Sequence, residues 1–110
     1  MRPYGCPVEL AFSTLGGKWK VVILARLKER PHRYAELRSA IPQLSDKVLT
    51  QRLRELVADE LVSQSKQGRR GAPSTYRLSK RGRELRPALE ALYVWGIAEA
   101  ARTGVSFERS

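Results

Sequence analysis

Four polar side chains between residues 47 and 54 have the spacing of one face of an α-helix. At about 100° per residue, Lys47, Gln51 and Arg54 fall together, with Thr50 at their edge. Such side chains can form hydrogen bonds with base edges and phosphates in the major groove of DNA. A solvated helix surface produces the same stripe, so the face alone does not separate nucleic-acid contact from plain exposure.

The helix that must carry this face has its own start signal and its own buried side. Ser45 can cap it with its hydroxyl, and Asp46 puts a carboxylate in the first turn, where the helix dipole favours negative charge. Leu49, Leu53 and Leu56 recur at helical spacing opposite the polar stripe. We therefore expect these leucines to face a core while the polar stripe faces outward.

The neighbouring segments follow the order helix, turn, helix, strand, loop, strand. A helix over residues 34–41 is ended by Pro42, because proline disfavours helical geometry in the residue before it. After the polar helix, residues 61–65 and 74–78 have the composition of two strands joined by a loop over residues 68–73. This order is the plan of a winged helix-turn-helix, a module that reads duplex DNA.

The loop and its flanks are one-sidedly basic. Between Leu61 and Arg83 there are seven basic residues and no acidic one: Lys66, Arg69, Arg70, Arg77, Lys80, Arg81 and Arg83. A loop of this kind can rest on the phosphate backbone as a wing.

Composition agrees with a polyanionic partner. The chain has 21 Lys and Arg against 11 Asp and Glu, a formal net charge of +10, which implies attraction to nucleic acid or to an anionic membrane. We expect no membrane partner and a cytoplasmic protein, because no apolar run approaches the roughly 18 residues of a span and no secretory signal is visible. One Cys and one His cannot form the usual zinc site, so neither a metal nor a cofactor is expected. His32 is interpreted as a turn residue or a phosphate contact.

Helices are also predicted on both sides of the DNA-reading elements. Pro7 can open a helix over residues 7–15 that Gly16 and Gly17 end, and Ser79 can cap another that reaches about residue 103, with a kink or later start at Pro87. The second helix is apolar on most sides, and Leu92, Tyr93, Trp95 and Ile97 carry the surplus. A crowded monomer core would account for this surface, but a homodimer interface is favoured, because two-fold symmetric proteins read palindromic sites.

The expected fold class is therefore α+β and mainly helical. The whole chain, residues 1–110, is interpreted as a single winged helix-turn-helix domain. Its helix-turn-helix core spans about residues 18–78, and its dimerisation helices span about residues 7–15 and 79–103.

Short motifs along nearly the whole chain resemble the HxlR-type transcriptional regulators, relatives of the MarR group. They are Cys6-Pro7-Val8-Glu9, Gly16-Gly17-Lys18-Trp19-Lys20, Glu36-Leu37-Arg38, Ile41-Pro42, Leu49-Thr50-Gln51-Arg52-Leu53-Arg54-Glu55-Leu56 and Tyr76-Arg77-Leu78-Ser79. The resemblance implies a dimeric bacterial regulator that binds operator DNA through a winged helix. It maps the DNA-reading helix and the wing tip onto Ser45, Lys47, Thr50, Gln51, Arg54, Arg69 and Arg70.

Two positions depart from the family pattern. Glu60 stands where the family often has glycine after the reading helix, and glutamate in a left-handed conformation costs on the order of 1 kcal/mol. We therefore expect this helix to end by another geometry. Thr75 replaces an acidic residue that often precedes the tyrosine of the second wing strand, which leaves the wing more basic.

Cys6 is the one residue with possible covalent chemistry. It lies just before a helix N-terminus, where the dipole favours a thiolate, and some members of the resembled family sense oxidants or electrophiles with a cysteine here. A buried, inert packing role is the alternative. An oxidant or small-molecule effector is compatible with this sequence, which does not identify one.

Three function classes can be compared on these observations. We favour a sequence-specific, homodimeric repressor that binds double-stranded, palindromic operator DNA. A sequence-indifferent basic protein, associated with the chromosome or with RNA, would share the charge but would not need a capped reading helix. An enzyme is not expected, because no nucleophile, base and acid set and no phosphate-binding loop is present.

Overall fold

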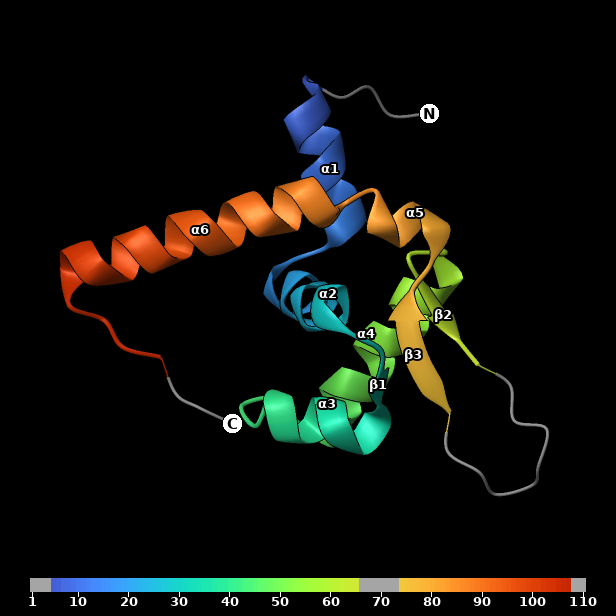
Figure 1. The fold of residues 1–110 in the computed structure, drawn as a ribbon. Coiled ribbons are helices and arrows are strands. Elements are labelled where there is room, and N and C mark those ends of the chain that lie inside the picture. Colours follow the sequence, from blue (N-terminus) through green and yellow to red (C-terminus); the bar gives the residue numbers. More distant parts are fainter. Residues whose placement is uncertain (1–4, 66–73, 108–110) are drawn as a thin grey trace.

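The computed structural model describes residues 5–65 and 74–107. Along the chain the elements are α1 (Pro7–Leu15), α2 (Lys18–Glu29), β1 (His32–Arg33), α3 (Tyr34–Ala40), α4 (Asp46–Ala58), β2 (Val62–Gln64), β3 (Thr75–Leu78), α5 (Lys80–Arg83) and α6 (Arg86–Thr103). Helices dominate and the strands form one small sheet, which confirms the α+β, mainly helical prediction (Figure 1). The predicted wing tip, Arg69 and Arg70, lies outside the described residues.

The sheet joins the wing strands to a short strand from the helical part. Its order is β1-β3-β2, and both pairings are antiparallel, with His32 opposite Tyr76 and Val62 opposite Leu78. His32 is buried, at 4% exposure, and its Nδ1 lies 2.8 Å from the carbonyl oxygen of Arg30. The interpretation of His32 as a turn residue or phosphate contact was wrong, because this side chain is enclosed within the fold.

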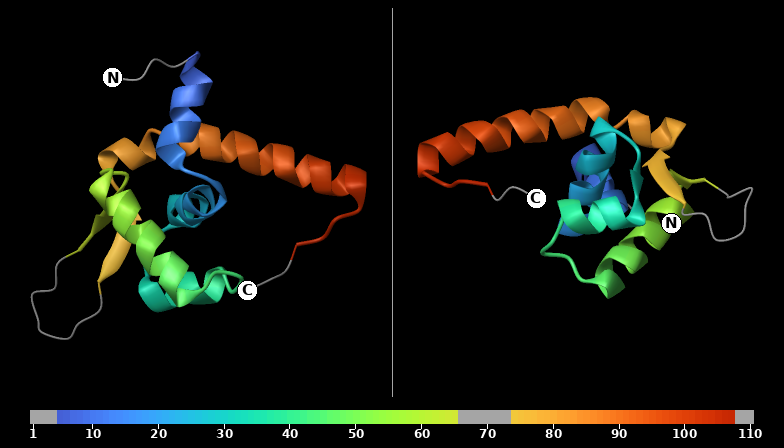
Figure 2. Two further views of the ribbon diagram at one scale, coloured as in Figure 1. Left: turned by 180° about the vertical axis from the view of Figure 1, so that it is seen from behind. Right: turned by 60° about the horizontal axis from the view of Figure 1, so that its bottom comes forward.

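The core forms where α2 passes between α6 on one side and α3 with α4 on the other (Figures 1 and 2). From α2 it receives Ile23, Leu24 and Leu27, and from α4 the three leucines whose spacing predicted a buried face. The remaining buried members are Leu37, Ile41, Leu44, Leu61, Val62, Leu78 and Leu89. This core fixes α4 by its apolar side and leaves its polar side outward.

The helix boundaries follow the capping signals of the sequence. Pro7 lies in the first turn of α1, and Gly16 ends that helix with φ +63°, a left-handed conformation that suits glycine. Gly104 ends α6 in the same way, with φ +76°. Ser79 caps a short α5 by accepting a hydrogen bond from the backbone N–H of Gly82. The helical path then breaks, and α6 begins with Pro87 in its first turn, so the expected later start is confirmed.

Glu60 has the left-handed conformation that the sequence was expected to avoid. Its φ is +62°, the only positive φ of a non-glycine residue in the described part of the chain. The backbone N–H groups of Glu60 and Leu61 donate to the carbonyl oxygens of Val57 and Leu56, both at 3.0 Å. This paired pattern is the glycine-type helix end, so the expectation of another geometry was wrong. The two hydrogen bonds and the burial of Leu61 hold the glutamate in place.

Glu60→Gly is therefore expected to stabilise the fold. Glycine has no Cβ penalty at positive φ, and after its larger entropy loss on folding the net gain should be about 0.5 to 1 kcal/mol. Thermal unfolding should show a midpoint raised by roughly 3 to 5 °C. Glu60→Ala removes the same carboxylate but keeps the Cβ, so it should leave the midpoint nearly unchanged. An equal rise in both variants would assign the effect to charge instead of backbone conformation.

Two helices extend beyond the compact part. α1 and α6 project away from the sheet in Figure 1 and in the left view of Figure 2, and every residue of α1 is exposed or half-buried. Within the described residues, we find no helix with the length and apolar character that crossing a bilayer requires.

Candidate nucleic-acid interface

The polar stripe of α4 lies where the sequence predicts it. Lys47, Gln51 and Arg54 are exposed, whereas the leucines of the opposite side are at most 2% exposed. The Ser45 hydroxyl accepts a hydrogen bond from the backbone N–H of Val48 at 3.2 Å, so the predicted cap is present. An outward row of ammonium, amide and guanidinium groups on a rigid helix is suited to reading base edges in a major groove.

Thr50 differs from the other three members of the stripe. It is half-buried, and its Oγ1 lies 3.2 Å from the hydroxyl oxygen of Tyr34 on α3. Its hydroxyl therefore has a partner inside the protein. A DNA contact from Thr50 would come from the edge of the stripe, as its angular position indicates.

A polar network holds the N-terminal end of α4 against α3. The Tyr34 hydroxyl donates to Asp46 Oδ1 at 2.8 Å, and Arg38 Nε lies 2.8 Å from the same oxygen. Arg38 also donates to the backbone carbonyl of Leu44, in the turn between the helices. Sequence reasoning assigned Asp46 only to the helix dipole and missed Tyr34 and Arg38, because their partners lie several residues away along the chain. The network fixes the direction in which the polar stripe points.

The other end of α4 is attached to α2 by charged groups. Lys20 Nζ lies 3.6 Å from Glu55 Oε1 and 3.7 Å from Asp59 Oδ2, and Arg52 lies 2.7 Å from Glu55. The hydrogen bond from Arg52 lowers the pKa of the Glu55 carboxyl, and the charge of Lys20 acts in the same direction. A lowered folded-state pKa means that this carboxylate adds stability above its ordinary pKa and loses it as the pH falls through the lowered value. Because Glu55 is solvent-accessible, the contribution is small.

The wing strands run beside the reading helix. Tyr76 on β3 is half-buried, and burial raises the pKa of its phenol, with Tyr34 adding to the rise and Arg54 of the polar stripe opposing it. The phenol is therefore neutral at physiological pH and can donate a hydrogen bond. Arg77, which was part of the predicted basic run, is exposed on the same strand. In the described part of the wing strands, Arg77 is thus the one basic residue, and it is exposed.

Comparison with known proteins is decisive for the class of protein. A sequence model described as HxlR-like helix-turn-helix matches residues 14–103. The chain belongs to this family. A relative in Bacillus subtilis (strain 168), named as the uncharacterized HTH-type transcriptional regulator YdzF, is 39% identical over 99 residues, covering 89% of this chain and 91% of that protein.

Solved structures of transcriptional regulators, some of them described as MarR family, share the fold. The redox regulator HypR in its oxidised form superposes with a TM-score of 0.79 at 32% identity, over 84% of this chain and 96% of that one. The reduced form of the B. subtilis transcriptional regulator YodB gives a TM-score of 0.71 at 32% identity, over 84% and 91%. This HxlR-like chain is a helix-turn-helix transcriptional regulator, and its relatives are regulators, not enzymes.

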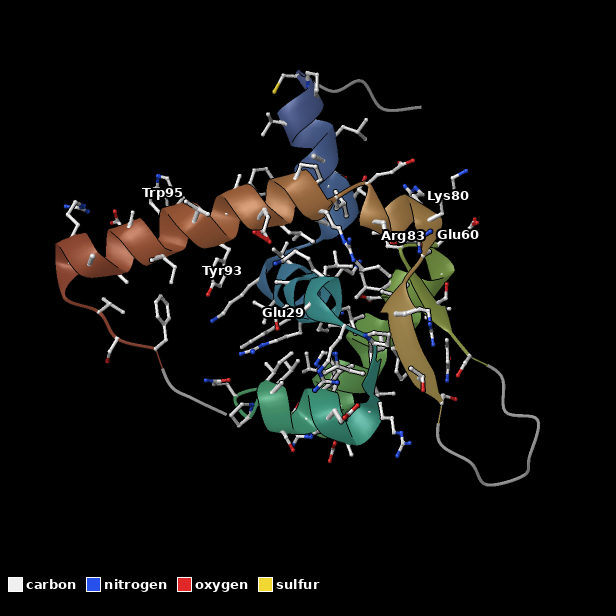
Figure 3. All side chains as sticks on the ribbon, in the orientation of Figure 1. Glu29, Glu60, Lys80, Arg83, Tyr93 and Trp95 are labelled. Atoms are coloured by element: carbon white, nitrogen blue, oxygen red, sulfur yellow. The ribbon has the colours of Figure 1, made fainter. Side chains whose placement is uncertain are left out.

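The exposed apolar residues of the C-terminal helix, α6, lie on two different sides of that helix. Leu92, Tyr93, Trp95 and Ile97 are 56%, 56%, 66% and 47% exposed. Tyr93 points from α6 toward α2, whereas Trp95 points away from the body of the molecule (Figure 3). Leu92, Tyr93 and Ile97 line a cavity beside α2, and Trp95 does not. These four residues, which the sequence grouped as one interface, therefore face two environments.

Cys6 stands at the N-terminus of α1 in an accessible position. It is the N-cap residue, and its backbone carbonyl accepts hydrogen bonds from Glu9 and Leu10 at 3.0 and 3.3 Å. The thiol belongs to an exposed residue. Within one chain, Cys6 therefore does not pack in the core.

Proposed function

We propose that this HxlR-like regulator acts as a homodimeric repressor that binds a palindromic operator. Each protomer inserts α4 into the major groove and rests its basic wing on the adjacent backbone. The observation that carries the proposal is the exposed stripe of Lys47, Gln51 and Arg54 on a helix whose apolar side is buried and whose two ends are anchored. A preorganised donor array of this kind favours reading of sequence over plain charge attraction.

Assembly is supported by the unpartnered apolar surface of the terminal helices. Trp95 on α6 and Phe12 on α1 are 66% and 68% exposed, and both helices carry further exposed large apolar side chains. Extended apolar surface of this kind often marks a protein–protein interaction site. A two-fold dimer built on these helices would present two copies of α4 at a fixed spacing. Two copies related in this way match a palindrome whose half-sites lie about one helical turn apart.

The division of work between helix and wing gives the direct test. Gln51→Ala or Arg54→Ala should cost roughly 1 to 3 kcal/mol on the operator and relax base preference at one position in each half-site. Arg69→Ala combined with Arg70→Ala should weaken binding to all sequences alike and flatten the dependence of affinity on salt. Fluorescence anisotropy with operator and scrambled duplexes at several salt concentrations measures both effects.

Two results of that experiment would count against the proposal. If the wing variant alone loses its base preference, then the wing reads the bases and α4 does not. Equal affinity of the wild-type protein for operator and scrambled DNA would favour the alternative of a sequence-indifferent nucleic-acid-binding protein.

We also propose that Cys6 makes operator binding responsive to oxidants or electrophiles. The thiol is exposed at the start of α1, beside the surface assigned to the dimer, and a structural relative is described as a redox regulator. Because Cys6 is the only cysteine, a disulfide must join two chains or a small-molecule thiol. Either product would alter the packing of α1 and thus the spacing of the two reading helices.

Diamide, mild peroxide or a quinone should therefore lower operator affinity of the wild-type protein. Cys6→Ser should bind the operator normally and ignore these reagents. The affinity of both proteins is measured before and after treatment, and mass spectrometry identifies the adduct. Insensitivity of the wild-type protein, with Cys6 confirmed as modified, would remove the sensing role.

A further inference from the structure

The hydroxyl groups of Thr50 and Tyr34 form a chain of hydrogen bonds that ends on a carboxylate. The Tyr34 hydroxyl donates to Asp46 Oδ1 at 2.8 Å, and Thr50 Oγ1 lies 3.2 Å from the same tyrosine oxygen. A carboxylate only accepts, and a phenol has a single proton, which goes to the charged acceptor. Thr50 is therefore the donor in its contact with Tyr34, and its one hydroxyl proton is directed toward α3.

This direction limits what Thr50 can offer to a base pair. Its hydroxyl has no second proton for the acceptor atoms of guanine, adenine or thymine in the major groove. The methyl group of the same side chain takes part in no hydrogen bond and is free to contact an apolar group of a base. Among the four bases, the apolar group in the major groove is the 5-methyl group of thymine.

Thr50 is placed to reach the same groove as the exposed stripe. It is half-buried and lies about one helical turn from Lys47 on one side and from Arg54 on the other, and both of these residues are exposed. A contact from Thr50 would therefore fall at the edge of the bases that the stripe covers.

The hydrogen bond to Tyr34 also fixes the conformation of Thr50. Threonine in a helix populates two χ1 rotamers, and this bond favours the one that directs Oγ1 to α3. The far end of the chain is held as well, because Arg38 Nε lies 2.8 Å from Asp46 Oδ1. The methyl group is thus oriented before DNA binds, which lowers the entropy cost of the contact.

We propose that Thr50 reads a thymine in each half-site through the 5-methyl group of the base, and that Tyr34 is the positioning residue that holds the threonine rotamer. This inference rests on the proposed reading of an operator by α4 and identifies one base of that operator. Burial of a single methyl group changes an affinity by a factor of about four.

Replacement of thymine by deoxyuridine tests the contact. The probe is the duplex of highest affinity selected from a random DNA pool, resynthesised with deoxyuridine at each thymine position in turn, in both half-sites together. The change removes one methyl group and leaves the hydrogen-bonding groups of the base in place. At one position the wild-type protein should lose roughly fourfold in affinity for each half-site, or about fifteenfold in all, by fluorescence anisotropy at constant salt.

Thr50→Ser identifies the residue that makes the contact. Serine keeps the hydroxyl and its bond to Tyr34 but lacks the methyl group, so this variant should bind the thymine and deoxyuridine duplexes within about twofold of each other. Thr103→Ser is the matched control. It removes the same group from the last residue of α6, where the threonine hydroxyl donates to the carbonyl oxygen of Glu99 at 2.8 Å. It should keep the wild-type ratio of the two affinities.

Tyr34→Phe tests the positioning role. Without the phenol oxygen, Thr50 can adopt its second rotamer, so the ratio should fall to roughly half of the wild-type value or less. Arg38→Met is the comparison, because it removes the ion pair with Asp46 and leaves the bond between Tyr34 and Thr50. This variant should bind both duplexes more weakly and keep the ratio. A ratio measured on one protein does not depend on how much of that protein is folded.

Three results would overturn the proposal for a protein that prefers the selected duplex to a scrambled one. They are the absence of any thymine whose replacement lowers the affinity, a wild-type ratio in Thr50→Ser, and a wild-type ratio in Tyr34→Phe. Equal affinity of the wild-type protein for the selected and scrambled duplexes would overturn operator reading itself, and this inference with it.

Discussion

Trp95→Glu is expected to separate the two protomers and to lower affinity for a full operator by at least about a hundredfold. Trp95 is 66% exposed on the side of α6 that faces away from α2 (Figure 3). In the proposed dimer this side chain is covered, and a carboxylate buried there without a partner is strongly unfavourable. Analytical ultracentrifugation and operator binding at matched protein concentration measure the two effects.

Trp95→Phe is the control for that experiment. It keeps an apolar ring at the contact, so the variant should remain dimeric and retain most of its operator affinity. Circular dichroism should show a folded Trp95→Glu chain, because Trp95 contributes little to the core of one protomer. A Trp95→Glu protein that stays dimeric and binds a full palindrome as the wild type does would remove this side of α6 from the interface.

Gly82→Ala is expected to destabilise the fold by at least about 3 kcal/mol. Gly82 is buried in α5, and a Cβ at this position would lie 2.0 Å from the carbonyl oxygen of Leu61. That carbonyl accepts a hydrogen bond from the backbone N–H of Ser79, so it cannot move away without loss of the contact between α5 and the start of the wing. A loss of this size is a large part of the stability of a small domain.

Urea unfolding compares this variant with a second glycine in a helix. Gly96→Ala adds the same methyl group where nothing lies within 4 Å, so it should be neutral or stabilising by up to about 1 kcal/mol. Equal unfolding free energies for the two variants would contradict the close approach at Gly82.

The helix boundaries could be predicted because their causes are local. Pro7, Gly16 and Ser45 act through the backbone of nearby residues, and each is found at the helix end that it predicts. The faces of α4 were predictable for a similar reason. The spacing of Leu49, Leu53 and Leu56 fixes which side is buried.

The parts that sequence reasoning missed depend on contacts between distant segments. The hydroxyl of Tyr34 meets Asp46 and Thr50 only because α3 and α4 pack at a particular angle, which no local pattern specifies. Glu60 is held at positive φ by the closing hydrogen bonds at the end of α4, against its intrinsic preference. The conformational preference of glutamate alone predicted that Glu60 would avoid a positive φ.

Which side of α6 faces the domain could not be predicted from the sequence either. Composition revealed an excess of apolar residues, but a helix that is apolar on most sides does not indicate which residues face its own domain. The structure separates Tyr93, beside α2, from Trp95 on the outer side. That separation depends on how α6 docks on α2, a tertiary contact that follows the break after α5.

Selection of bound duplexes from a random DNA pool tests the central claim most directly. The intact protein is incubated with the pool at physiological salt, and the retained DNA is sequenced over several rounds. The proposal predicts an enriched palindrome with two half-sites whose centres lie about 10 base pairs, or a multiple of that distance, apart. Retained DNA with no enriched sequence, or with a single asymmetric site, would contradict a homodimer that reads its operator through two copies of α4.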